Sequence, residues 1–250
     1  MSIKFEHTEV LGWEAAIRGM RNPMNSWDKS DSGFGCWQSG HDEDPWSCDS
    51  CDVPAIEGCN HMGTEYIIGP NDHDLMMRLA KAGTDHRKFL RMITVYVDIT
   101  APLYWWKEFD TYKVGTVANS CSTMHKIQAK EFTMDDFSCE HLTDQSRAIM
   151  EDIINLLNMH RALFVSKNGK QIDAHTVMTD ECYAKYKKDI WWQMIQLLPS
   201  SYNQRRTVML NYEVLANIYK SRKNHKLDEW RELCKWIEEL PYNELIVGKE

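Results

Sequence analysis

No run of about 18 apolar residues occurs in the 250-residue chain, so the sequence predicts no membrane-spanning helix. Its first ten residues alternate charged and apolar side chains and lack the apolar middle region of a secretion signal. We therefore expect a cytoplasmic protein. Excess positive charge is missing too, because the formal net charge is −8. This balance argues against broad electrostatic binding to nucleic acid, but it leaves room for a local basic pocket that holds one small phosphate.

The chain also lacks internal repeats and low-complexity tracts. Its composition, with 43% hydrophobic and 26% charged residues, is typical of a folded protein. We expect a single domain over residues 1–250. Residues 22–63 stand apart, because they are polar, rich in Gly, Ser, Asp and Cys, and follow no hydrophobic period. A structureless loop of this length is unusual inside a domain, so we interpret them as an insertion that is either stapled or mobile.

Four of the eight cysteines lie in this insertion: Cys36, Cys48, Cys51 and Cys59. The pair Cys48-x-x-Cys51 has a spacing suited to one zinc ion. The other two cysteines, with His41 or His61, are able to complete a tetrahedral site. Such a closed site would be structural and would leave no position for catalysis. Reduced structural cysteines and a redox pair are the alternatives that the spacing leaves open.

Hydrophobic spacing predicts mostly helices. The predicted helices are Glu9–Arg21, Asp72–Ala82, Leu103–Phe109, Thr143–Leu163, Asp180–Leu198, Tyr202–Arg222 and Leu227–Leu240. Strict alternation predicts a half-buried strand over Met92–Thr100, and Asn168-Gly169 is typical of a short hairpin. In the helix from Thr143 we expect a core stripe of Ile149, Ile153, Leu156, Leu157 and His160. The sum is an α+β domain in which a small antiparallel sheet is packed by long helices.

Polar residues recur along the predicted helix from Tyr202. Asn211 and Arg222 are 11 residues apart, about three helical turns, so they would share one face, whereas Asn217 would lie on another. A solvated helix side is the alternative. The same applies to a group of cations that would attract phosphate or simply face solvent at a helix end: Lys220, Arg222, Lys223, Lys226 and Arg231.

The order of these residues resembles the flavin-dependent thymidylate synthase family. That family has a Leu-Pro, a Tyr-x-Gln, two asparagines six apart and an arginine five later, as in the stretch Pro199 to Arg222. Its Gln-Trp-Glu is loosely matched by Asp228-Glu229-Trp230. The resemblance implies that Asn211 and Asn217 contact FAD. It also implies that Arg222, as the catalytic residue, polarises the pyrimidine of dUMP.

A second stretch carries the resemblance further. After Ala101-Pro102, the segment Thr111-Tyr112-Lys113 stands where the family has its Arg-His-Arg signature, and Asn119 and Ser122 are retained. The resemblance assigns Lys113, Asn119, Ser122 and Arg222 to substrate binding. Gly83-Thr84-Asp85-His86 is similar to a family turn whose histidine approaches the flavin, although His86 also suits a helix end.

The resemblance implies a homotetramer with active sites between subunits. It implies transfer of a one-carbon unit from methylenetetrahydrofolate to a pyrimidine nucleotide, with reduced FAD supplying hydride and NADPH as a further co-substrate. The departures matter, because Thr111 and Met124 replace arginines that bind phosphate bidentately. Two hypotheses follow: a one-carbon transferase for dUMP or a related nucleotide, or a catalytically inactive nucleotide-binding or protein-interaction scaffold. A zinc-stapled binding protein is a third.

Overall fold

The computed structural model describes residues 3–35, 65–166, 169–171 and 176–248. Its centre is an antiparallel four-stranded sheet in the order β1-β4-β6-β5. The four strands are β1 Lys4–Leu11, β4 Thr94–Pro102, β5 Val117–Ser120 and β6 Asn203–Asn211. A separate two-stranded sheet pairs β2 Gly33–Gly35 with β3 Glu65–Ile67. Single 3-10 turns cover Asn22–Met24, Trp27–Lys29, Arg87–Arg91 and Met134–Asp136.

Strand β4 is the centre of the core and confirms the predicted strand. Its inward residues alternate as expected, and four side chains here are almost fully buried: Ile93, Val95, Val97 and Ile99. The strand continues to Pro102, where α3 (Leu103–Phe109) begins with Pro102 as its N-cap. The outward residues Tyr96 and Asp98 leave the opposite face of the sheet polar and partly open.

The predicted helix Tyr202–Arg222 is wrong in its first half. Residues Asn203–Asn211 form β6, and α6 covers only Tyr212–Arg222. In β6 the buried Gln204, Val208 and Leu210 alternate with more exposed residues, which is the period of a strand and not of a helix. The strand pairs with β4 along its whole length, so the tertiary contact overrides the helical spacing of the residues that follow.

The N-terminal helix also begins later than predicted. Residues 4–11 form β1 on the edge of the sheet, and α1 covers only Trp13–Arg21. Gly12 makes the turn between them at φ +96°, and a Cβ there would lie 2.2 Å from the carbonyl oxygen of Met92. The next helix, α2 (Pro70–Lys81), agrees with the predicted one.

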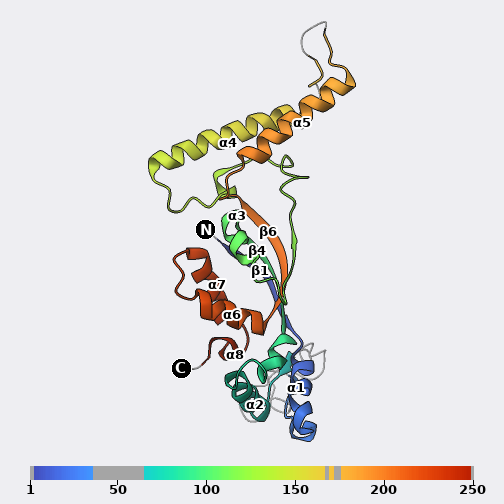
Figure 1. Ribbon diagram of the computed structural model, residues 1–250, viewed down its shortest axis with the longest axis vertical. Helices are drawn as coiled ribbons and strands as arrows, with labels where there is room; N and C mark the ends of the chain where they lie inside the picture. The colour runs from blue at the N-terminus through green and yellow to red at the C-terminus, as the bar shows by residue number, and fades with distance from the viewer. Residues whose placement is uncertain (1–2, 36–64, 167–168, 172–175, 249–250) are drawn as a thin grey trace, which may run out of the picture.

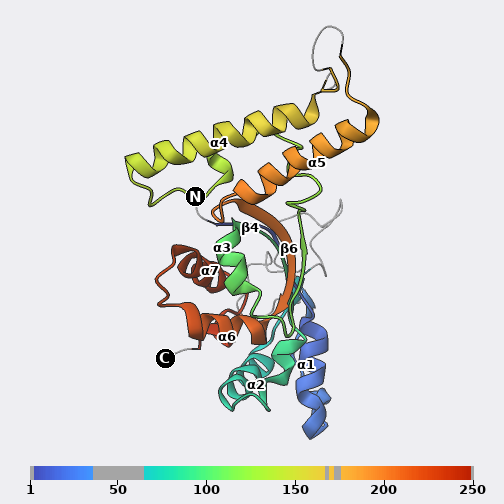
Figure 2. The same cartoon turned by 45° about the horizontal axis from the view of Figure 1, so that its top comes forward.

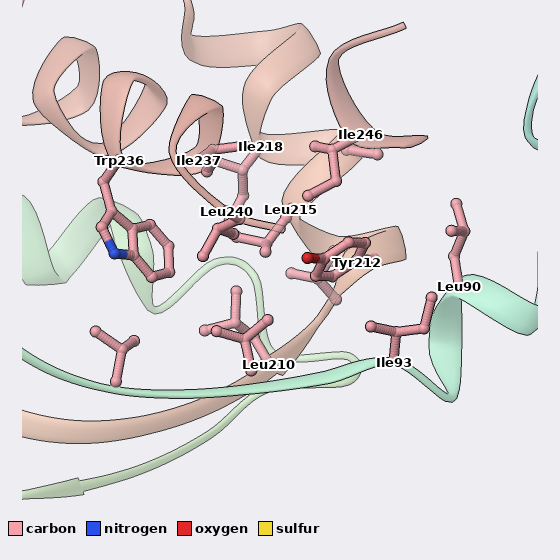
Figure 3. Packing of buried hydrophobic residues seen from close by; sticks show 14 of the residues in the cluster. Leu90, Ile93, Leu210, Tyr212, Leu215, Ile218, Trp236, Ile237, Leu240 and Ile246 are labelled. Atoms are coloured by element: carbon pink, nitrogen blue, oxygen red, sulfur yellow. The ribbon is translucent and has the colours of Figure 1, made fainter. Parts of the chain in front are cut away.

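One face of the sheet is covered by α6, α7 (Asp228–Glu238) and the short α8 (Glu244–Val247). α7 confirms the predicted helix from Leu227. Figure 3 shows side chains of these helices turned toward Ile93 and Leu210 of the sheet region, among them Leu215, Ile218 and Ile237. This packing forms the main core of the protein.

Two long helices, α4 (Asp144–Val165) and α5 (Asp180–Leu197), extend side by side beyond one end of the sheet (Figures 1 and 2). They confirm two predicted helices and enclose a second small core around Leu157, Ile190 and Met194. The predicted core stripe of α4 is largely wrong, because only Leu157 of its five residues is fully buried. Ile149 and Leu156 are exposed, since α4 packs on one partner helix rather than inside a bundle.

The prediction of a hairpin at Asn168-Gly169 is wrong for its first strand, because Phe164 and Val165 are the last residues of the helix α4. Gln171 forms an isolated bridge with Val177. Asn168 and Ile172 lie outside the described residues. Within the described ranges, no helix is long and apolar enough to cross a membrane.

Candidate functional site

Arg222 ends α6 inside an aromatic and acidic cluster. Its Nε donates to Tyr112 Oη at 3.0 Å, and its Nη1 donates to Glu108 Oε2 at 3.0 Å. The guanidinium also lies 4.5 Å from the centroid of the Trp230 ring, and Trp230 Nε1 donates to the same Glu108 oxygen at 3.0 Å. The Arg222 guanidinium therefore makes a cation–π contact with Trp230, and the Glu108 carboxylate neutralises its charge. Any ligand group that accepts a hydrogen bond from Arg222 has to compete with Glu108 for the guanidinium.

Asn211 is the N-cap of α6. Its Oδ1 accepts the backbone N–H of Val214 at 3.0 Å, and the residue is buried. Its Nδ2 faces Gly115, where an added Cβ would lie only 2.9 Å away. Asn211 thus belongs to the strand–helix junction, so it does not share a helical face with Arg222 as predicted. Its capping bond is worth about 1 kcal/mol by analogy with other caps.

Asn217 is exposed on α6 and lines a cleft of about 270 Å³ between α2, α6 and the C-terminal segment. Lys81, Lys220 and Lys223 line the same cleft, which gives it a basic rim. At its side, Arg87 forms a two-point ion pair with the buried Glu213: Nη2 to Oε1 is 3.0 Å and Nε to Oε2 is 2.9 Å. Glu244 also lines the cleft, so the three lysines leave it with a net positive charge, and Arg87 is already neutralised by Glu213.

His86 directly precedes Arg87 and is exposed, but its side chain does not line this cleft. Of the predicted basic cluster, Lys220 and Lys223 face the cleft. Arg222 is paired with Glu108, and Arg231 donates to the Asp228 carboxylate and to the backbone carbonyls of the turn that precedes α7. The cluster is thus divided among three surroundings.

Ser122 lines a larger cavity of about 630 Å³ at the Asn203 end of β6. Its Oγ accepts the N–H groups of Met124 at 3.2 Å and His125 at 2.9 Å, which fixes the turn after β5. Thr100 of β4 and Arg205 of β6 also line the cavity. Each lies next to a residue of its strand whose side chain is buried, and neighbouring side chains of a strand point to opposite faces. Their side chains therefore belong to the sheet face that α6 and α7 leave uncovered.

The cavity is rich in cations. Lys4, Lys126, Lys130 and Arg205 line it, together with the acids Asp135 and Asp136. Lys130 is paired with Asp136, and Arg205 donates to Asp98 at 2.6 Å. Hydrogen bonds from Thr207 and then from Arg205 lower the pKa of Asp98 below its usual value. Among the described residues, Lys4 and Lys126 form no ion pair.

An acceptor in this cavity wall lacks a partner. The Oδ1 of Asn203 is buried and accepts no hydrogen bond from the described residues. Its neighbour Gln204 is fully engaged, because Nε2 donates to the carbonyl of Cys121 at 2.7 Å and Oε1 accepts from Arg206 at 3.0 Å. Gln204 thus fastens the turn that carries Ser122 to β6, whereas Asn203 keeps an acceptor for a ligand donor.

The remaining predicted substrate residues lie outside this cavity. Lys113 is exposed in the loop after α3, and Asn119 is exposed on β5 opposite Thr207. The Ser122 cavity and Asn211 lie at opposite ends of β6 (Asn203–Asn211), about 26 Å apart at the usual rise of a strand. One chain therefore does not bring the predicted residues into a single pocket.

The resemblance did not point to Glu108 or Lys126. Glu108 reaches Arg222 across 114 positions of sequence, and Lys126 lies in an irregular turn with no hydrophobic period. Neither pattern can be detected in a single sequence. The predicted zinc ligands Cys36, Cys48, Cys51 and Cys59 lie outside the described residues. Within the part of the chain that the structure describes, no group of three or more His, Cys, Asp or Glu residues is placed to hold a metal ion.

The whole chain is similar to known structures. Two are structures of the flavin-dependent thymidylate synthase ThyX from Helicobacter pylori with FAD and dUMP. Each is 15% identical, covers 100% of this chain and 98% of the other, and gives a TM-score of 0.56. A third is a UMP/dUMP methylase, PolB from Streptomyces cacaoi, bound with 5-Br dUMP; it is 10% identical, with 95% and 88% covered and a TM-score of 0.50.

No family model matches the sequence, and no curated protein matches it in a sequence search. The structural likeness at these identities concerns the fold. It confirms the predicted α+β class: the chain has the fold of flavin-dependent thymidylate synthases, a small antiparallel sheet packed by long helices.

Proposed function

We propose that this protein binds FAD and a pyrimidine nucleotide, dUMP or a related one, and transfers a one-carbon unit to the base. The observation that carries the proposal is the likeness in fold, which spans the whole chain, to proteins whose solved structures hold FAD with dUMP, or 5-Br dUMP. The Ser122 cavity adds support, because its volume of about 630 Å³ suits a small-molecule ligand. Methylenetetrahydrofolate would be the one-carbon donor and NADPH the reductant.

We place the nucleotide phosphate in the Ser122 cavity. Lys126 and Lys4 have no ion pair among the described residues, so they supply the point charges that the lost arginines no longer provide. Ser122 offers a hydroxyl, and the buried Oδ1 of Asn203 offers an acceptor for an N–H or O–H of the ligand. Lys113 and Asn119 lie outside this cavity, so in this proposal they act on a nucleotide held by a neighbouring subunit.

We place FAD along the basic cleft beside Asn217. Lys81, Lys220 and Lys223 carry the positive charge that a diphosphate needs, and the cleft fits only part of so large a molecule. When bound, FAD supplies hydride chemistry, and the protein binds and orients it. His86 and Asn211 do not line this cleft, so in this proposal they contact parts of FAD that extend beyond it, and Asn211 is already used as a helix cap. A homotetramer would let subunits share these sites.

A second candidate is a scaffold that binds nucleotide without catalysis. The specific observation in its favour is the Glu108–Arg222 pair, because the one arginine proposed to activate the base is neutralised within the chain. Catalysis requires the nucleotide to displace Glu108 from that guanidinium or to use it together with Arg222. A scaffold requires neither.

The absorption spectrum of the purified full chain separates these outcomes. Bound flavin gives visible absorption. A protein that is colourless as purified and does not bind added FAD on titration refutes the enzyme proposal. Release of tritium from position 5 of labelled dUMP, in the presence of FAD, NADPH and methylenetetrahydrofolate, then tests catalysis. Flavin binding without tritium release favours the scaffold.

The phosphate site is tested by calorimetric titration with dUMP. Lys126→Ala should weaken dUMP binding by roughly ten- to a hundredfold, since a hydrogen bond to a charged group is worth about 1.5–3 kcal/mol. Lys107→Ala is the matched control, because that lysine is exposed on α3 and lies outside the cavity. Equal affinities of the two variants would remove the cavity from the proposal.

The zinc proposal for Cys36, Cys48, Cys51 and Cys59 stands apart from the nucleotide site. Elemental analysis of protein purified from zinc-supplemented cells should find about one zinc per chain if the four thiolates form a closed site. The absence of zinc from such preparations would exclude it. In either case the spectrum of the flavin is unaffected.

A further inference from the structure

A groove of about 640 Å³ lies at the start of α1. Among the residues that the structure describes, it shares no lining residue with the Ser122 cavity or the cleft beside Asn217. Four aromatic side chains line it: Trp13, Phe34, Tyr66 and Tyr242. Trp13 is only 8% exposed and lies deep in the groove, whereas Phe34 is 57% exposed and forms its outer side. We call this site the aromatic groove, and its volume suits a small-molecule ligand.

The rings of the aromatic groove meet edge to face in two pairs. Phe34 and Tyr66 lie opposite each other in the β2–β3 pair, with ring centroids 5.2 Å apart and ring planes at 85°. Trp13 and Tyr242 have ring centroids 5.2 Å apart and ring planes at 68°. A flat heterocycle stacks best on rings that are parallel to it. Rings at steep angles instead form adjoining walls, which a compact and nearly spherical group can contact together.

Tyr242 is held in place by its backbone and by its hydroxyl. Its φ of +52° lies in the left-handed region, which is unusual for a bulky residue and recurs at ligand sites. Its Oη accepts the backbone N–H of Ile68 at 3.2 Å, and Tyr212 donates to the carbonyl of the preceding Pro241. These bonds fix the ring of Tyr242 against Trp13 before a ligand arrives, which lowers the entropic cost of binding.

The charge of the aromatic groove favours a positive ligand. Glu14 is the only charged residue in its described lining. The Glu14 carboxylate accepts from Arg18 at 3.2 Å, but the two side chains are 61% and 63% exposed, so this pair is weak and leaves the carboxylate accessible. Burial, and then the negative charges of Asp72 and Glu14, raise the pKa of Tyr66 to about 12. The phenol therefore stays neutral at pH 7, and the acids near its ring favour a cation over an anion.

We propose that the aromatic groove binds a small molecule that carries a quaternary ammonium group, of the kind found in choline. Such a cation is attracted to the faces of aromatic rings within about 6 Å of their centroids. It has no N–H group, so it needs no hydrogen-bond acceptor in the site. A primary ammonium would lose hydrogen bonds to water there, because the only side-chain oxygens of the described lining are those of Glu14, Tyr66 and Tyr242. This site goes beyond the proposed function and does not depend on it.

Ligand-observed proton NMR of the full chain, titrated at constant ionic strength, tests the class of ligand. Choline should bind, and the signal of its methyl protons reports the binding directly. Dimethylbutanol, the isostere with carbon in place of nitrogen, has the same shape without the charge, and ethanolamine has the charge without the methyl groups. Both should bind about tenfold more weakly than choline, because neither combines a cation with an apolar surface. No binding of choline, or equal binding of the uncharged isostere, overturns the proposal.

Variants of Phe34 test the place of the site, because this exposed side chain is not part of the main core. Phe34→Leu keeps an apolar side chain but removes the ring, so choline should bind about fivefold more weakly, whereas Phe34→Trp should bind it at least as tightly as the wild type. Trp27→Leu is the matched control, because Trp27 is a 50% exposed aromatic residue outside the groove. Equal affinities of Phe34→Leu and Trp27→Leu for choline overturn the site. A protein that binds choline but no flavin would refute only the proposed function, and a flavoprotein that does not bind choline would refute only this site.

Discussion

Replacing Asp72 by asparagine should strongly destabilise the protein. Asp72 is fully buried at the start of α2, and its Oδ1 accepts from Arg21 Nε at 2.6 Å. Its Oδ2 accepts from the hydroxyls of Ser30 and Ser32, each at 2.7 Å. Arg21 is also buried, so Asp72→Asn leaves its charge without a counter-ion. Breaking a buried ion pair from one side costs about 3–5 kcal/mol.

The expected change in melting temperature follows from the size of the chain. At about 2–4 °C per kcal/mol for a protein of this length, Asp72→Asn should lower Tm by roughly 6–20 °C. Circular dichroism during heating measures it, and urea unfolding gives the free energy. Asp74→Asn is the matched control two residues along the same helix, because its pair with Arg78 is solvent-exposed and should be worth less than about 1 kcal/mol.

The effect of pH gives a second check on the same residue. Burial alone would raise the pKa of Asp72, but hydrogen bonds from Ser32, Ser30 and Arg21 lower it below its ordinary value. A lowered pKa in the folded state means that the carboxylate stabilises the fold above the unfolded pKa of about 3.9. This contribution is lost as pH falls through the folded pKa. The wild type should therefore lose its advantage over Asp72→Asn only below about pH 4. Equal stability of Asp72→Asn and Asp74→Asn at pH 7 would refute the reasoning.

Two further predictions concern the site region and the thiols. Gly83→Ala should lower the free energy of unfolding by about 1 kcal/mol, because alanine is strained at the positive φ of this position and nothing lies within 4 Å of the added Cβ. Gly115→Ala should lower the free energy of unfolding in urea by more than Gly83→Ala does, because the added Cβ would also lie too close to Asn211 Nδ2. Equal losses for the two variants would show that the Asn211 side chain moves aside without a cost in stability. Burial raises the pKa of Cys234 to about 11 and also raises that of Cys139. Site-resolved mass spectrometry after alkylation of the folded protein at pH 8 should therefore find Cys121 and Cys182 modified and these two protected, and labelling of Cys234 would contradict this burial.

Local patterns in the sequence predicted the parts of the fold that local chemistry decides. The alternation of Ile93, Val95, Val97 and Ile99 identified β4 because each inward position meets the same core. The sequence predicts a helix over the residues of β6, because the helical spacing of α6 extends backward into them. Its pairing with β4, as between Val97 and Val208, joins residues more than 100 positions apart. No local period in a single sequence reveals such a partner.

The same limit explains why the candidate site could be predicted only in pieces. Motif order along the chain identified Ser122 and Arg222, and the resemblance made them parts of one substrate site. The sheet separates their surroundings: Arg222 contacts α3 and α7 on the covered face, and the cavity beside Ser122 includes Thr100 and Arg205 of the other face. A nucleotide that contacts both residues would therefore take them from different copies of the chain.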